Sequence, residues 1–291
     1  MAAQRMARRN AIRLLAAVAL LAVAAAAAVL VLGHGDDGED ATSNRAASGP
    51  GPWPVGDHVQ AARAPVANPV RNATPQPGWR RYSGPVPIFR YHAVDEFPAG
   101  DPYPELFVEP ADFRAQMDWL QAHGYQAVDL RAVEHAWFAA GTLPAKPVVL
   151  SFDGVQGELA SVVLPELSRR GWPAVLVLDG EAPVAKRTLV RRLLALGWEV
   201  AAAGADVAGS RRRLEAELGT RVANFSFPPE AADRPDVAAV EAAGYAGATI
   251  TGAGFATSAE PYEMPRITVF GLSGVDGFAE AMRSRGEGVG A

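Results

Sequence analysis

The pattern of hydrophobic positions changes character at Val86. From there to the C-terminus, short apolar runs alternate with longer stretches in which apolar residues recur every three or four positions. Short apolar runs bounded by turn residues are typical of buried strands, and the longer amphipathic period is typical of helices. The predicted strands are Val86–Arg90, Pro147–Phe152, Ala174–Leu178, Glu199–Ala202, Ala223–Phe227, Ala246–Thr251 and Ile267–Phe270.

Helical patterns separate these strands, and several of them end at a glycine, which readily adopts the left-handed conformation that closes many helices. The predicted helices are Pro110–His123, Glu158–Arg170, Lys186–Leu196, Ser210–Leu218 and Asp236–Ala243. Strands that are apolar throughout and alternate with helices indicate a parallel sheet covered by helices. About seven such units in residues 86–291 predict a short α/β barrel, complete or incomplete, rather than a flat doubly wound sheet. The functional residues of such a barrel follow the carboxyl ends of the strands.

The first 85 residues follow neither pattern. Leu14–Leu32 consists of 19 residues, all Ala, Leu or Val, and as a helix it would measure about 29 Å, close to the thickness of a bilayer core. Arginines precede it and acidic residues follow it, so we expect a single-pass anchor with the N-terminus inside. A cleaved signal peptide, with secretion, is the alternative.

The expected organisation therefore has four parts. A basic N-terminus (1–13) precedes the anchor or signal (14–33), and a disordered linker rich in Pro, Gly and Ala (34–85) leads to the barrel domain (86–291). This order predicts a cell-membrane protein whose barrel lies outside the cytoplasm.

Composition limits the chemistry. Hydrophobic residues make up 49% of the chain and charged residues 20%, enough apolar surface for a sizeable core. The net charge of −5 argues against a nucleic-acid partner, because nucleic-acid binders usually carry a basic face. The absence of cysteine excludes disulfides, thiolate metal sites and cysteine nucleophiles. Five histidines are present, and none follows His135.

A series of motifs runs in consistent order through residues 86–280. They are Val86–His92, Phe113–Met117, Gly124-Tyr125, Lys146–Asp153, Gly171–Ala174, Gly197–Val200, Phe225–Pro228, Ala243–Tyr245 and Pro265–Ile267. Together they resemble the polysaccharide deacetylase family, which is also called the NodB-homology family or carbohydrate esterase family 4. The resemblance implies a distorted (β/α)7 barrel and a hydrolase that removes acetyl groups from cell-envelope glycans.

The resemblance also implies a divalent metal such as zinc, which activates a water between two imidazoles and a carboxylate. Asp153 matches the family's general base. The three ligand positions are occupied by Gly154, Ala203 and Val207, so the metal site is degenerate and we expect no cofactor. Pro229 replaces a tyrosine whose backbone N–H helps to hold the oxyanion, and proline has no N–H to donate.

Other polar residues follow predicted strands and are candidates for a substrate groove. They are His92, Asp179, Asp206 and Glu230, to which the loop residues Phe227 and Pro228 are added. Four carboxylates at one barrel mouth, with Asp153 included, would suit a hard cation or an amino sugar. The alternative is that the acidic residues are ordinary helix caps and loop residues, and that His92 has a structural role.

Three classes of function remain open. The first is a catalytically impaired, deacetylase-like protein that binds cell-envelope polysaccharide or peptidoglycan. The second is an active hydrolase of carbon–nitrogen bonds that uses non-standard ligands to N-deacetylate a polysaccharide. The third is an envelope scaffold that binds a protein partner. Fold alone does not separate these classes, because one fold hosts many functions.

Overall fold

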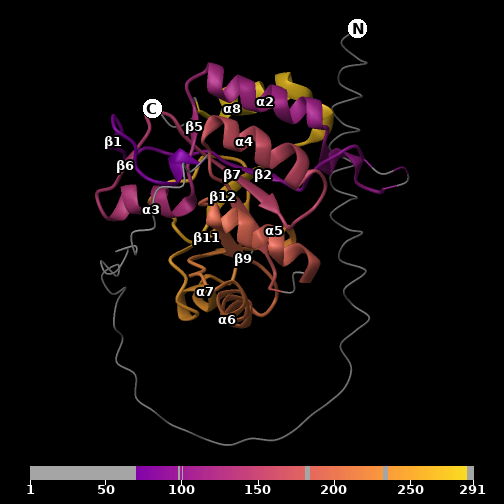
Figure 1. Cartoon of the computed structure of the whole chain (residues 1–291). Coiled ribbons are helices and arrows are strands. Elements are labelled where there is room, and N and C mark those ends of the chain that lie inside the picture. Colours follow the sequence, from indigo (N-terminus) through magenta and orange to yellow (C-terminus); the bar gives the residue numbers. More distant parts are fainter. Residues whose placement is uncertain (1–69, 98, 100, 181–183, 232–234, 287–291) are drawn as a thin grey trace, which may run out of the picture. The chain divides into compact units, whose positions relative to one another are not determined.

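A closed barrel of seven parallel strands forms the centre of the protein (Figure 1). The computed structural model describes residues 70–97, 99, 101–180, 184–231 and 235–286. The barrel strands are β2 (Ile88–Tyr91), β7 (Pro147–Asp153), β8 (Val175–Leu178), β9 (Glu199–Ala202), β10 (Asn224–Ser226), β11 (Gly247–Thr251) and β12 (Met264–Thr268). They lie side by side in the order β2-β12-β11-β10-β9-β8-β7, and the pairing of β2 with β7 closes the ring. The predicted seven-stranded α/β barrel is thus confirmed, and the ring of strands is closed.

Successive residues of each strand point to opposite faces of the sheet, and this alternation separates two apolar clusters. Phe89 and Leu150 belong to the larger cluster, which also contains residues of the surrounding helices. Ile88 and Val149 belong to a second cluster with other strand residues. Arg90 lies two positions after Ile88, so it shares the face of the second cluster. The strands therefore carry polar side chains inward near their carboxyl ends.

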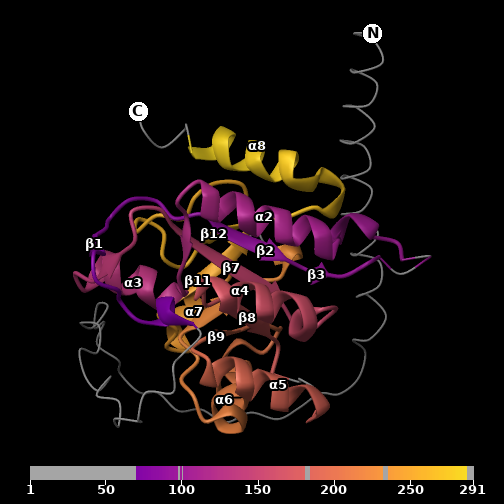
Figure 2. The ribbon, with the colours of Figure 1, turned by 45° about the horizontal axis from the view of Figure 1, so that its top comes forward.

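Helices cover the barrel on its outside (Figures 1 and 2). The α-helices are α2 (Pro110–Ala122), α3 (Leu130–Phe138), α4 (Leu164–Arg170), α5 (Val184–Ala195), α6 (Val207–Leu218), α7 (Val237–Ala242) and α8 (Gly274–Gly286). A π-helical turn, η3 (Leu159–Val163), precedes α4, and the short 3₁₀ turns are η1 (Arg71–Ala73), η2 (Pro104–Leu106), η4 (Pro229–Ala231) and η5 (Gly271–Ser273). Neither α3 nor α8 was predicted. Figure 2 shows α8 lying along α2, where its Phe278 packs against Phe89 and Trp119.

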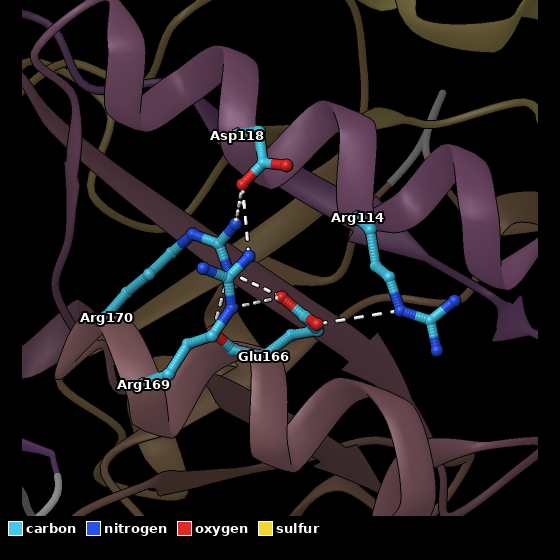
Figure 3. A network of polar contacts seen from close by, with 5 residues as sticks. All are labelled: Arg114, Asp118, Glu166, Arg169 and Arg170. Atoms are coloured by element: carbon cyan, nitrogen blue, oxygen red, sulfur yellow. Dashed lines mark hydrogen bonds and ion pairs between the residues drawn. The ribbon is translucent and has the colours of Figure 1, made fainter.

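A network of charged side chains joins α2 to α4 (Figure 3). Arg170, which is buried, pairs with Asp118 of α2 and with Glu166 one turn earlier in its own helix. Arg169 contacts the same two carboxylates, and Arg114 approaches Glu166 at 3.5 Å. Since most of these groups are half-buried or exposed, the network mainly sets the register of two surface helices.

Short strands complete the fold. They are β1 (Arg80–Arg81) with β6 (Thr142–Leu143), β3 (Ala93–Val94) with β4 (Phe107–Val108), and β5 (Gln126–Ala127), which pairs with the start of β7. Residues 70–85 were predicted to belong to a disordered linker, yet Val70 and Asn72 are buried and Asn72 donates to the Ala127 carbonyl at 3.2 Å. Within the described residues, packing against the barrel therefore begins at Val70. The sequence pattern did not reveal it, because prolines dominate this stretch and only a few residues make the contacts.

The predicted membrane segment, Leu14–Leu32, lies outside the described residues. Of the helices that are described, none combines the length and the apolar character needed to cross a bilayer.

Candidate functional site at the barrel mouth

A pocket of about 650 Å³ opens where the carboxyl ends of the strands meet, the position at which barrels of this type carry their sites. Its size lies within the range of small-molecule sites. Residues that follow four successive strands line it, together with one side chain of α5 and one of β12. These residues are Asp153, Gly154, Asp179, Lys186, Ala203, Ser226, Phe227, Pro228, Pro229 and Arg266.

Two arginines hold Asp153 at the base of this pocket. Arg90 Nε lies 2.5 Å from Asp153 Oδ2, and Arg266 Nη1 lies 2.9 Å from Asp153 Oδ1. In the sequence, Asp153 is 63 residues from Arg90 and 113 residues from Arg266. The three residues meet because β2 lies between β7 and β12 in the closed barrel. Both carboxylate oxygens of Asp153 are therefore engaged by guanidinium groups.

Burial alone would raise the pKa of Asp153, but the charges of Arg266 and Arg90 outweigh it, so the pKa is lowered from its ordinary value. Asp153 is thus ionised at neutral pH. A general base works best when its pKa lies near the working pH and a lone pair is free to take the proton. Asp153 fails the first condition, and two arginines occupy one lone pair on each of its oxygens, although it occupies the base position of the family that the sequence resembles.

The pocket also contains buried polar atoms without a partner among the described residues. Ser226 is 1% exposed and Arg266 is 3% exposed, and the Ser226 hydroxyl and Arg266 Nε form no hydrogen bond there. Buried polar atoms are nearly always satisfied, so each exception needs an explanation. A bound ligand at this mouth is one.

The three positions that the resemblance assigns to metal ligands carry no donor side chain. Gly154 and Ala203 line the pocket, and Val207 is the first residue of α6, where it packs against the larger apolar cluster. Throughout the described part of the chain, His, Asp and Glu form no group of three that could hold a metal ion. The residues at the mouth therefore do not fit a divalent metal, because guanidinium groups occupy the oxygens of the nearest carboxylate.

Of the other candidate residues, some line the pocket and others lie outside it. Asp179, Phe227 and Pro228 line the pocket with Asp153. Asp206 caps α6 by accepting from Gly209 N at 2.8 Å and pairs with Arg213, and Glu230 lies exposed on η4. The four carboxylates expected at one mouth therefore do not converge, since helix capping uses Asp206 and exposure leaves Glu230 outside.

His92 follows β2 and is half-buried, with its ring edge-on to Phe107. Burial lowers the pKa of His92, and the charge of Arg90 acts in the same direction, while Asp153 opposes it. The imidazole is therefore neutral at pH 7. It lies close enough to Asp153 to sense its charge, but it is not part of the pocket lining.

Arg90 and Arg266 were not among the predicted site residues. The sequence did carry a signal, because each is a charged residue within an otherwise apolar strand. A charge buried in a barrel needs a partner. Finding that partner required knowing that β2 closes on β7.

A second buried polar cluster lies at the opposite, amino ends of the strands. Glu199 accepts from Asn224 Nδ2 at 2.9 Å and from the Arg131 backbone N–H at 3.2 Å. Glu134 is also buried, and its Oε1 has no partner within the described residues. Burial raises the pKa of Glu199 to about 7 and raises that of Glu134 as well. This end of a barrel usually contributes to stability rather than to function.

Comparison with known proteins places the fold. The structure matches the Streptococcus pyogenes deacetylase PplD, in complex with acetate, with a TM-score of 0.60 and 17% identity over 69% of this chain and 99% of that one. A polysaccharide deacetylase from Bacillus cereus matches with a TM-score of 0.57 and 22% identity over 69% of each chain. A de-N-acetylase from Aggregatibacter actinomycetemcomitans gives a TM-score of 0.57 with 17% identity over 67% of this chain and 99% of that one.

The sequence itself resembles a curated enzyme over a shorter stretch. Over 85 residues, or 29% of the chain, it is 33% identical to the poly-β-1,6-N-acetyl-D-glucosamine N-deacetylase of Escherichia coli K12. The matched stretch spans 12% of the length of that relative. No protein-family model matches the chain. The barrel is therefore the fold of polysaccharide deacetylases, as the sequence motifs predicted.

Proposed function

We propose that this chain is a membrane-anchored protein whose barrel lies outside the cytoplasm and binds a cell-envelope glycan without hydrolysing it. The observation that carries the proposal is the state of Asp153. Two buried arginines hold the carboxylate that would act as the base, and the neighbouring Gly154 offers no ligand for a metal.

The chemistry of deacetylation needs three contributions, and each is weakened or missing at the position that the resemblance assigns to it. An activated water needs a base, and Asp153 is a weak one, because its pKa is lowered and each of its oxygens accepts a hydrogen bond from an arginine. A metal needs donors, but the side chains of Gly154 and Ala203 offer none. The oxyanion needs a hydrogen-bond donor, and Pro229 has no backbone N–H. These three changes together favour binding over catalysis.

The pocket suits a saccharide better than a small ion. Its volume of about 650 Å³ lies well inside the range for organic ligands. Pro228 and Pro229, which are partly buried and exposed, provide apolar faces against which a sugar ring can pack, and Ser226 and Arg266 provide polar groups. The structural relatives named as polysaccharide deacetylases support a glycan as the ligand class.

Location follows from the N-terminal sequence. Four arginines precede Leu14–Leu32 and acidic residues follow it, an asymmetry that keeps the N-terminus in the cytoplasm. Such an orientation would bring the barrel to the side of the membrane on which envelope glycans lie.

The test uses the full-length chain purified in detergent micelles. We expect less than stoichiometric zinc by elemental analysis, no acetate release from acetylated chitooligosaccharides, and sedimentation of the protein with insoluble envelope glycan. Equimolar zinc with acetate release that Asp153→Asn abolishes would establish the active hydrolase instead. A chain that releases no acetate and does not sediment with glycan would favour the protein-binding scaffold.

A further inference from the structure

The charges at the base of the pocket do not balance. Arg90 and Arg266 are both buried, at 7% and 3% exposed, and Asp153 is the single carboxylate paired with them among the described residues. Two positive charges therefore face one negative charge in a region of low dielectric. A buried charge without a counterion costs several kcal/mol, so the site is incomplete by one negative charge.

Other charged groups of the pocket do not fill this gap. Lys186 and Asp179 also line the pocket, and both are exposed, so neither is a buried counterion for the arginines. Lys186 Nζ donates to the Val155 carbonyl at 2.6 Å, and Asp179 has an interaction of its own. Among the described groups that the two arginines contact, none other than Asp153 is acidic.

Two unpartnered donors mark where the missing anion would lie. Arg266 Nε and the Ser226 hydroxyl are buried, form no hydrogen bond within the described residues, and belong to side chains that line the same pocket. They come from β12 and β10, two strands that flank β11. A guanidinium N–H and a hydroxyl are the donors that bind a carboxylate well.

We propose that the pocket recognises an acidic saccharide, a hexuronic acid whose carboxylate is bound by Arg266 and Ser226. The inference rests on the proposed function, since it names the class of glycan that binds at this mouth. One missing negative charge fits a carboxylate, which carries one charge, better than a phosphate monoester, which carries nearly two at neutral pH. The sugar ring fills the remaining volume against Pro228 and Pro229.

The test measures binding of defined sugars to the full-length chain by isothermal titration calorimetry. The main probe is a tetrasaccharide of alternating glucuronic acid and N-acetylglucosamine. Its matched probes are the same tetrasaccharide with methyl-esterified carboxylates, neutral chitotetraose and glucose 6-phosphate. We expect the acidic tetrasaccharide to bind at least about tenfold more tightly than its methyl ester, because a hydrogen bond to a charged group is lost.

Two variants locate the binding group. Ser226→Ala removes one donor without changing the charge, and we expect it to weaken binding of the acidic tetrasaccharide about tenfold while leaving the melting temperature close to wild type. Arg213→Met removes an exposed arginine outside the pocket lining and serves as the control, with affinity unchanged. Equal weakening by both variants would indicate a general electrostatic attraction and overturn the proposed site.

The outcomes separate the two proposals. Equal binding of the acidic tetrasaccharide and its methyl ester would overturn the carboxylate site but leave glycan binding intact. Tighter binding of glucose 6-phosphate than of the acidic tetrasaccharide would overturn the choice of a carboxylate. Binding of chitotetraose alone would likewise reject the acidic ligand. If no sugar bound, the proposed function itself would fail.

Discussion

Replacing Asp153 by Asn tests whether this carboxylate is structural. The substitution preserves shape but removes the charge that Arg90 and Arg266 share, and it turns one hydrogen-bond acceptor into a donor that faces a guanidinium N–H. Removing one member of a buried ion pair costs about 3–5 kcal/mol, because the remaining charge is left without a counterion. A domain has about 5–15 kcal/mol of stability in total. We therefore expect the urea concentration at the midpoint of unfolding, measured by tryptophan fluorescence, to fall by a large amount.

The matched control is Asp206→Asn. Asp206 also follows a strand and pairs with an arginine, but it is exposed, and asparagine is itself a good helix cap, so we expect a much smaller loss of stability than for Asp153→Asn. The contribution of Asp153 should also vanish in acid. Its folded pKa is lowered, so its stabilisation is complete above its ordinary value of 3.8 and is lost as the pH falls through the folded value. Equal losses for the two variants at pH 7 would refute the reasoning.

Three further predictions follow from other parts of the chain. Burial raises the pKa of Glu199 from 4.5 to about 7. Between these two pH values the unfolded state has lost the proton that the folded state still holds, so the free energy of unfolding falls as the pH rises through this range. In Glu199→Gln this decline, on the order of 3 kcal/mol, should shrink in urea titrations between pH 5 and pH 8; an unchanged slope would exclude Glu199 as its source. The combined variant Gly154→Asp, Ala203→His and Val207→His should bind zinc more tightly than wild type in a chelator competition, with Gly154→Asp alone as control. If affinity stays at the wild-type level in a folded protein, these positions do not converge. Of two reporters fused after Ala291, we expect activity from the one that functions outside the cytoplasm and none from the one that functions in the cytoplasm. Activity of the cytoplasmic reporter would contradict the proposed topology.

The sequence predicted the barrel because short, mainly apolar runs alternate with helical patterns, and that alternation is visible locally. It did not reveal β5, whose two residues are too few to show a period, or the packing of Val70, which depends on contacts made by single residues. The site was predicted in the same uneven way. Asp153 stood out because it matches the general base of the family that the sequence resembles. Its partners Arg90 and Arg266 become recognisable only once closure of the ring places three distant strands together.

Under the proposed function, the same geometry accounts for a deacetylase-like mouth that binds a glycan without a metal. In the family that the sequence resembles, a divalent cation would face two carboxylates, the ligand and the base, and the charges would balance. In this chain two guanidinium groups supply the same two positive charges, but Gly154 stands in the place of one carboxylate, so a single negative charge remains. The balance is therefore restored only when a ligand brings its own anion. On this reasoning the loss of the metal ligand and the gain of an acidic ligand are one change, because the carboxylate missing from Gly154 is the one that the glycan would supply.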